Sequence, residues 1–267
     1  MRILSYMGPE GLCAGQLEGE MVHQISAGVL DVVCGAAVER TGDTVSLAGV
    51  QIAAPLRPGK LIGIGLNYRD HAAETGKPVP EMPLLFAKMA TSVTGPSGPV
   101  VLPTYTAKPD FEGELAVVIG RVARAVAASD ALAYVFGYAV MNDVSARDVQ
   151  QSEPQWVRAK GADTFAPWGP WITTADEVPD PQALSIRTWL SGELVQDGTT
   201  ADMVFGVAEL IAFISASFTL EPGDVITTGT PAGVGVARTP PRYLRDGDVV
   251  RVEISGLGVI EHPIIGA

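Results

Sequence analysis

Three carboxylates stand where two apolar stretches of the chain break off. Glu112 and Glu114 are two positions apart in DFEGELAVVIG, and on a β-strand such residues point to the same face. Asp143 follows a second apolar stretch, YAVMN. Like charges placed together repel one another unless a cation, a proton or an arginine lies between them. Oxygen ligands without histidine or cysteine suit Mg²⁺, with Mn²⁺ or Ca²⁺ as alternatives. The simpler alternative is a surface strand edge with two solvated glutamates.

A histidine and a glutamate form a second pair. His71 and Glu74 are three positions apart in NYRDHAAETG, so one helical turn would place both side chains on one face. A carboxylate beside an imidazole orients the ring and raises its basicity, as a general base acting on water requires. The alternative is a structural or solvent-exposed histidine. His23 and His262 lie in less suggestive contexts, an N-terminal hairpin and a position beside a proline near the C-terminus.

The elements that must position these side chains are mainly strands. The 30 glycines and 20 prolines separate short apolar runs instead of forming a low-complexity tract, which favours β structure with many turns. Ser129 and Asp130 are good caps for a short helix. The clearest amphipathic helix is predicted over 207–220, with Phe218 on its apolar face. Core strands are predicted at 61–66, 114–120, 138–144 and 225–231, with a hairpin around Gly256 to Gly258.

The chain divides into a small and a large part. Residues 1–54 read as a small N-terminal β subdomain, because RILSYM alternates and QLEGEMVHQI contains a glycine-centred turn. The segment APLRPG, rich in proline and glycine, marks a boundary, and residues 55–267 form the main domain. The predicted fold class is β-rich α+β.

Composition excludes several classes of function. A formal net charge of −12 argues against a nucleic-acid partner, which requires a basic patch. No window approaches eighteen consecutive apolar residues, so we expect no transmembrane helix and no membrane partner. The N-terminus lacks the pattern of a secretory signal. Cys13 and Cys34 are expected to be reduced thiols, and the expected location is the cytoplasm.

Five separated stretches occur in an order that resembles the fumarylacetoacetate hydrolase family. They are GIGLNYRDHAAE, DFEGELAVVIG, NDVSARDVQ, AKGADTFAPWGPW and GDVITTGTPAGVG. The resemblance covers roughly residues 55–265, and residues 1–54 look like the variable extension of many members. It implies a mixed β-roll core, a homodimer, and Mg²⁺ or a similar ion held by three carboxylates.

The resemblance also implies roles for individual residues. Metal ligands would be Glu112, Glu114 and Asp143, and the pair that activates water would be His71 and Glu74. Lys160 would stabilise developing negative charge. Substrate contacts would come from Arg147, Gln150, Thr230 and Lys88. Simpler alternatives are a surface ion pair for Arg147, a solvated Lys160 and a plain turn at Thr230. Pocket-wall candidates are Trp156, Trp168 and Trp171, with core packing expected for at least two.

Together these features predict a metal-dependent hydrolase that cleaves a C–C bond in an acylpyruvate or related diketo acid. The cation and Lys160 would stabilise an enolate, while His71 generates hydroxide and Glu74 orients it. Alternatives on the same fold are an oxaloacetate-type decarboxylase and an isomerase of an unsaturated oxo-diacid, because fold does not settle reaction. The His71–Glu74 pair favours hydrolysis or decarboxylation. A catalytically silent metal-binding module is the remaining alternative.

Overall fold

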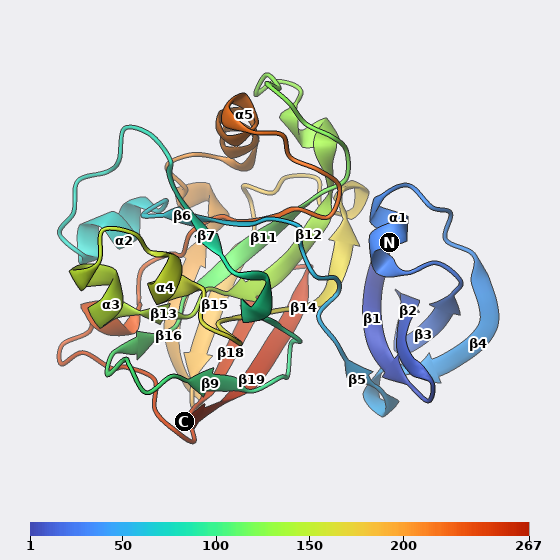
Figure 1. Cartoon of the computed structure of the whole chain (residues 1–267), viewed down its shortest axis with the longest axis horizontal. Coiled ribbons are helices and arrows are strands. Elements are labelled where there is room, and N and C mark those ends of the chain that lie inside the picture. The colour runs from blue at the N-terminus through green and yellow to red at the C-terminus, as the bar shows by residue number, and fades with distance from the viewer. Residues whose placement is uncertain (267) are drawn as a thin grey trace.

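The computed structural model describes residues 1–266, and over this range the protein is strand-rich α+β with mixed sheets (Figure 1). The predicted fold class is confirmed. Two large sheets pack against each other, and a short two-stranded ribbon lies beside them. Helices are few and short, and the side chains discussed below come from strands, from these short helices and from the loops that join them.

The larger sheet has twelve strands, with the order β4-β3-β2-β1-β14-β12-β11-β17-β6-β7, β5 paired to β1 and β8 paired to β14. Its strands outside the N-terminal part are β6 (Leu61–Gly65), β7 (Leu84–Lys88), β8 (Val93–Thr94), β11 (Gly113–Ile119), β12 (Val135–Asn142), β14 (Ala166–Thr174) and β17 (Val225–Thr227). All residues of β11 are buried. Leu115 and Val117 face one hydrophobic core and Ala116 and Val118 another, as the strand period of two requires.

The second sheet covers one face of β11 and β12. Its order is β16-β15-β18-β19-β9, and its strands are β9 (Val100–Leu102), β15 (Ser185–Leu190), β16 (Glu193–Thr199), β18 (Val249–Ile254) and β19 (Gly258–Gly266). Val250, Val252 and Ile254 of β18 share a core with Leu115 and Val117 of β11. The hairpin predicted near the C-terminus is therefore present, and it joins β18 to β19.

Short elements cluster at the end of β11 where the carboxylates begin. The ribbon pairs β10 (Pro109–Asp110) with β13 (Ser145–Ala146). The helices are α1 (Val29–Val33), α2 (Arg69–Glu74), α3 (Arg147–Ser152), α4 (Val157–Lys160) and α5 (Val207–Ser217). In Figure 1, α2, α3 and α4 lie together on one side of the molecule, away from the N-terminal strands. No helix within residues 1–266 is long and apolar enough to cross a membrane.

The N-terminal strands continue the larger sheet. They are β1 (Arg2–Gly8), β2 (Gly11–Glu18), β3 (Met21–Ile25), β4 (Arg40–Ser46) and β5 (Gln51–Ile52). Strand β1 pairs with β14 through Arg2 and Ile3, and Ile3 shares a core with Trp168. The domain boundary after residue 54 stays a prediction, because sheet and core both run across it. Cys13 and Cys34 are free thiols.

The structure differs in detail from two local predictions. The helix expected after Ser129 and Asp130 is a single 3₁₀ turn, η3 (Ala131–Tyr134), and β12 begins directly after it. Asp130 has helical rather than extended backbone angles, so its side chain makes no cap hydrogen bond. Phe218 lies beyond the end of α5 in an extended conformation and is 38% exposed. The other short 3₁₀ turns are η1 (Leu47–Gly49), η2 (Ala90–Ser92), η4 (Ala175–Glu177), η5 (Thr200–Asp202) and η6 (Gly235–Ala237).

Candidate active site

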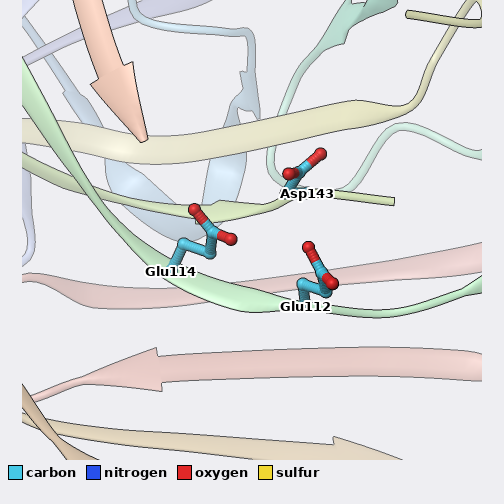
Figure 2. A group of neighbouring side chains, drawn as sticks. All are labelled: Glu112, Glu114 and Asp143. Carbon is cyan, nitrogen blue, oxygen red and sulfur yellow. The ribbon is translucent and has the colours of Figure 1, made fainter. Parts of the chain in front are cut away.

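The three predicted carboxylates meet in the structure. Glu112, Glu114 and Asp143 have ligand oxygens within 4.8 Å of one another, and all three residues are buried (Figure 2). Antiparallel pairing places Gly113 opposite Asn142, so the residues flanking that pair approach each other. The amide of Asp143 donates to the carbonyl oxygen of Glu112 at 2.8 Å. A solvated surface edge is therefore the wrong interpretation of this motif.

Two buried lysines contact the carboxylates. Lys160, at the end of α4, places Nζ 2.5 Å from Oε2 of Glu112 and 2.7 Å from Oδ2 of Asp143. Lys88, at the end of β7, places Nζ 2.5 Å from Oδ1 of Asp143 and donates to the carbonyl of Lys160. Lys160 is 2% exposed, so the alternative of a solvated lysine is wrong.

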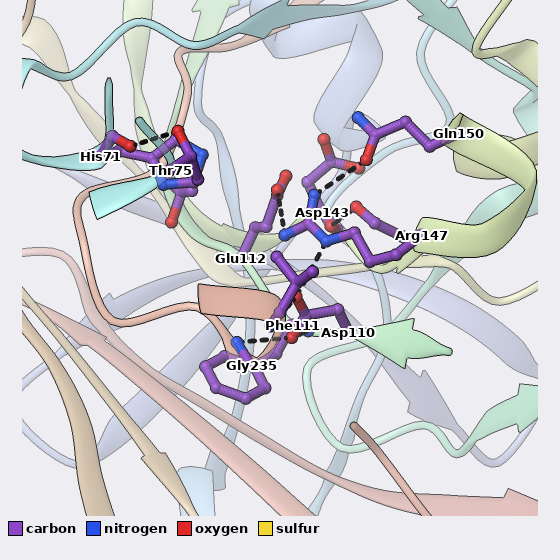
Figure 3. Close-up of polar contacts among 12 residues, drawn as sticks. His71, Thr75, Asp110, Phe111, Glu112, Asp143, Arg147, Gln150 and Gly235 are labelled. Atoms are coloured by element: carbon purple, nitrogen blue, oxygen red, sulfur yellow. Dashed lines mark hydrogen bonds and ion pairs between the residues drawn. The ribbon is translucent and has the colours of Figure 1, made fainter. Parts of the chain in front are cut away.

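Arg147 is buried beside Glu112 rather than paired at the surface. Its Nε donates to Oδ2 of Asp110 at 2.8 Å, and one terminal nitrogen lies 2.6 Å from Oε1 of Glu112. The other terminal nitrogen donates to Oε1 of Gln150 at 3.0 Å. Figure 3 shows this arrangement, with Arg147 between Gln150 and the two acids. Asp110 also accepts amide hydrogen bonds from Gly235 and the residue after it.

Burial and neighbouring charges shift the pKa values of Glu112 and Glu114 in opposite directions. Burial alone would raise the pKa of Glu112, but the positive charges of Arg147 and Lys160 outweigh it and hold that pKa well below its usual range. Burial raises the pKa of Glu114 well above its usual value, and the negative charges of Asp143 and Glu112 raise it further. Of the two glutamates, Glu114 is therefore the one whose ionised form an additional cation would stabilise more.

The donor set fits a hard divalent cation. The buried charged groups around the site are Asp110, Glu112, Glu114, Asp143, Lys88, Arg147 and Lys160, four acids against three bases. With all four acids ionised the group carries one uncompensated negative charge, and the three converging carboxylates favour binding of a cation that prefers oxygen ligands. The oxygens of Glu112, Glu114 and Asp143 are the atoms that could hold it.

The His71–Glu74 pair forms as the spacing predicts. Nδ1 of His71 lies 2.7 Å from Oε1 of Glu74 across one turn of α2. Oε2 of Glu74 accepts a hydrogen bond from the amide of Gly233 at 2.8 Å. Glu74 is thus fixed from two sides, and it orients the ring so that Nε2 is the nitrogen left for proton transfer.

The loop after β17 holds Glu114. Oε2 of Glu114 accepts hydrogen bonds from the hydroxyl of Thr227 and, at 2.8 Å, from the amide of Gly229. Thr230 donates its hydroxyl to the carbonyl of Gly113 at 2.9 Å and is buried. Thr230 therefore has more than a plain turn role, because it ties the loop to the strand that bears the glutamates.

One cavity of about 560 Å³ brings most of these groups together. Predicted residues in its lining are His71, Glu74, Glu112, Glu114, Arg147, Gln150, Lys160 and Thr230. Asp143 and Lys88 are absent from the lining and lie buried behind it. Of the tryptophans, Trp156 lines the cavity, Trp168 is buried in a core, and Trp171 stacks with Arg2.

Comparison with known proteins identifies the family and the fold of the chain. A family model described as fumarylacetoacetate (FAA) hydrolase C-terminal matches residues 60–265. The chain belongs to the fumarylacetoacetate hydrolase family. A second model, described as Rv2993c-like, N-terminal, matches residues 1–55. The protein is thus an enzyme of a superfamily that contains hydrolases and isomerases.

Solved structures of the fumarylacetoacetate hydrolase superfamily match along the whole chain. Fumarylacetoacetate hydrolase from Exiguobacterium antarcticum has a TM-score of 0.92 at 35% identity, covering 100% of both chains. The 2-hydroxyhepta-2,4-diene-1,7-dioate isomerase from Mycobacterium marinum has a TM-score of 0.87 at 38% identity, covering 100% of this chain and 98% of its own. A relative from Burkholderia multivorans is 46% identical over 280 residues, covering 97% of this chain and 96% of its own, and its name gives no substrate.

Three further residues of this fumarylacetoacetate hydrolase family site were missed by sequence reasoning. Asp110 anchors Arg147, and Asn142 accepts a hydrogen bond from the amide of Glu112 at 2.9 Å. Both begin motif stretches, Asp110 in DFEGELAVVIG and Asn142 in NDVSARDVQ, so their positions were a usable signal. Gln196 donates to Thr230 from the second sheet, and its stretch SGELVQDGTT reads as a polar hairpin with nothing to single it out.

Proposed function

We propose that this enzyme is a metal-dependent hydrolase that cleaves a C–C bond in an acylpyruvate or a related diketo acid. The observation that carries the proposal is the presence of the His71–Glu74 pair in the same cavity as Glu112 and Glu114. A general base and a cation site that face one cavity suit addition of water to a bound oxo-acid.

Positive groups in the cavity wall suit an anionic substrate. Arg147 and Lys160 line the cavity although each contacts an acid, and Gln150 lies beside Arg147. We propose that these three side chains bind the carboxylate and oxo oxygens. A divalent cation such as Mg²⁺, or alternatively Mn²⁺ or Ca²⁺, held by Glu112, Glu114 and Asp143, would polarise those oxygens.

His71 would supply the base for hydrolysis. Its Nε2 removes a proton from water, and the hydroxide adds to the acyl carbonyl carbon of the substrate. The C–C bond then breaks, its electron pair passes into an enolate of pyruvate, and the ammonium of Lys160 stabilises that charge. Return of the proton to the enolate carbon gives pyruvate and the carboxylic acid. Glu74 keeps the imidazole oriented through its 2.7 Å contact with Nδ1.

A second candidate is isomerisation of an unsaturated oxo-diacid. It is favoured by the similarity to the Mycobacterium marinum isomerase and to the 5-carboxymethyl-2-hydroxymuconate delta-isomerase of Mycobacterium smegmatis, the latter at 37% identity with a TM-score of 0.88. Isomerisation moves a proton between carbons and needs no attacking water, so the His71–Glu74 pair gives hydrolysis the preference. Decarboxylation of an oxaloacetate-like acid remains a further alternative on the same groups.

A substrate panel with metal control tests the proposal. Acylpyruvates, oxaloacetate and unsaturated oxo-diacids are mixed with enzyme containing Mg²⁺ or Mn²⁺, and loss of enol absorbance is followed together with product analysis. We expect acylpyruvates to give pyruvate and a carboxylic acid, and EDTA to abolish turnover. Turnover that survives EDTA would contradict the metal role. Rearranged diacid as the only product would establish the isomerase instead, and inactivity toward all substrates would favour a silent binding module.

A further inference from the structure

A buried glutamine of the second sheet contacts the site without lining its cavity. Gln196 lies in β16 and is 1% exposed. Its Oε1 accepts a hydrogen bond from the amide of Gly113 at 3.0 Å. Its Nε2 donates to Oγ1 of Thr230 at 2.8 Å and to the carbonyl of Pro231 at 2.9 Å. Both N–H groups of the amide therefore have partners, as a buried polar side chain requires.

These contacts close a ring. The hydroxyl of Thr230 donates to the carbonyl of Gly113 at 2.9 Å, while Gln196 joins the amide of Gly113 to the same hydroxyl. Gly113 stands between Glu112 and Glu114, and Thr230 faces the cavity that both glutamates line. The ring therefore sets the spacing between the strand with the carboxylates and the loop that faces the substrate.

Close packing against the second sheet restricts this spacing. A Cβ on Gly113 would lie 2.4 Å from Oγ1 of Thr188 and 2.9 Å from Cγ1 of Val252. Gly233, in the same loop as Thr230, has φ +109°, and a Cβ there would lie 2.0 Å from the carbonyl oxygen of Val195. Strand β11 and the loop are thus both pressed against the second sheet at the level of Gln196.

The same loop reaches the base. Gly229 donates its amide to Glu114, and Gly233 donates its amide to Glu74, each at 2.8 Å. A displacement of the loop would therefore move the amide that donates to Glu114 at the cation site. It would also move the amide that donates to Glu74, the carboxylate that orients His71. Those carboxylates are the groups on which the proposed reaction depends.

We infer that Gln196 is a positioning residue that holds Thr230 and its loop in register with the Glu112–Glu114 segment. The inference rests on the proposed function and extends it to a residue of the second sheet. Gln196 acts through Thr230 and Gly113 rather than on the substrate. Its loss should affect turnover more than metal binding, because Glu112 keeps its contacts to Lys160 and Arg147 and Asp143 keeps those to both lysines.

The first test replaces the amide with an apolar side chain of similar length. Gln196→Met is expected to lower kcat/KM for acylpyruvates about ten- to a hundredfold, because misplaced groups lose pre-organisation. The affinity for Mn²⁺ alone, measured by calorimetry, should change less than threefold. Gln182→Met is the matched control, because Gln182 also bridges two backbone groups, at Thr200 and Val207, but outside the cavity. It should keep kcat/KM within twofold.

A double-mutant cycle separates positioning from general loss of stability. Thr230→Val breaks the same ring from its other side, so Gln196→Met should add little further loss of kcat/KM in that background. If the losses of kcat/KM from the two single variants multiply in the double variant, Gln196 does not act through Thr230 and the inference is overturned. If Gln196→Met fails to fold, Gln196→Asn keeps the amide but shortens its reach, and the same loss is expected.

A binding assay makes failure of this inference distinct from failure of the proposed function. If the unaltered protein turns over no oxo-acid, oxalate, a planar dianion, is titrated into the Mn²⁺-loaded protein. Binding about tenfold weaker in Gln196→Met than in the unaltered protein and Gln182→Met would still support the positioning role. Activity and oxalate affinity within twofold of the unaltered protein would overturn it, and so would a loss of Mn²⁺ affinity as large as the loss of kcat/KM.

Discussion

At the level of single residues, His71 differs from the carboxylates because, within residues 1–266, the charged hydrogen-bond partner of its ring is Glu74 alone. Its ring contacts neither Glu112 nor Asp143 directly, whereas Lys160 contacts both. Removal of the imidazole should therefore spare the cation site. Removal of Lys160, by contrast, would take one positively charged partner from each of two buried carboxylates, Glu112 and Asp143.

His71→Ala is expected to lower the turnover of acylpyruvates by about 10²–10⁴-fold, the usual contribution of a general base. The Mn²⁺ affinity should stay within a few-fold, as measured by calorimetry on the same preparation. His23→Ala, at a position in the N-terminal hairpin, is the control and should keep full activity. A parallel loss of Mn²⁺ binding in His71→Ala would make His71 a ligand and contradict its assignment as the base.

His262 makes the stability of the fold depend on pH. Burial lowers the pKa of His262 from 6.5 to about 3, and its Nε2 lies 3.0 Å from Nδ2 of Asn142. The unfolded chain takes up a proton on this ring below its ordinary pKa, but the folded chain does so only near pH 3. The stabilisation of the folded state by neutral His262 is therefore complete above pH 6.5 and is lost as the pH falls toward 3.

His262→Gln removes this titration while keeping an acceptor for Asn142. Between pH 7.5 and 4, the free energy of unfolding of the unaltered protein should fall more than that of His262→Gln, by about 3 kcal/mol over the window. Urea unfolding at several pH values measures both slopes. Equal slopes would mean that His262 titrates alike in the folded and unfolded states.

At the scale of elements, the close packing of β11 against the second sheet depends on Gly113, which has no side chain. Gly113 lets Thr188 of β15 and Val252 of β18 approach the strand between the two glutamates. Leu115, two positions along the same face, fills the core between the sheets. The site thus depends on the closeness of two sheets as well as on the strand that carries its carboxylates.

Gly113→Ala should lower the free energy of unfolding by about 1–3 kcal/mol, because the added methyl meets packed atoms of a neighbouring sheet. Gly49→Ala is the control, since a Cβ there meets nothing within 4 Å and the backbone needs no left-handed angle. Denaturant unfolding of both variants measures the effect. Gly113→Ala as stable as Gly49→Ala would mean that the two sheets separate at little cost.

At the scale of the whole molecule, we propose that the protein is a homodimer that associates through one edge of the larger sheet. Strand β7 ends the larger sheet, and apolar side chains near it are exposed, among them Met82 at 65% and Leu84 at 44%. An exposed strand edge with apolar residues favours association.

Light scattering is expected to give a mass twice the 27.9 kDa of one chain. Leu84→Asp should shift the protein toward monomer, because it places a charge in the proposed contact. Lys77→Asp, on the exposed segment that follows α2, is the control and should leave the mass unchanged. A single-chain mass over a wide concentration range would contradict the dimer.

Local periodicity was enough to predict much of the fold and part of the site. The period of two along DFEGELAVVIG predicted that Glu112 and Glu114 would lie together, and the 3–4 spacing predicted α5 and the His71–Glu74 contact. The 3–4 spacing failed at Phe218, where the apolar pattern continues after the helix has ended. Family resemblance then supplied Lys160 and Arg147, whose burial no local pattern indicates.

The sequence by itself determined which side chains share a face within one element, because side-chain direction follows from backbone geometry over a few residues. Only the tertiary structure decided that Asp143 would reach the glutamates, since that depends on the register between β11 and β12. It also decided that Lys88 and Lys160 would both pair with Asp143 and that Gln196 would donate a hydrogen bond to Thr230. Such contacts join residues far apart in the chain, and packing of whole sheets fixes them.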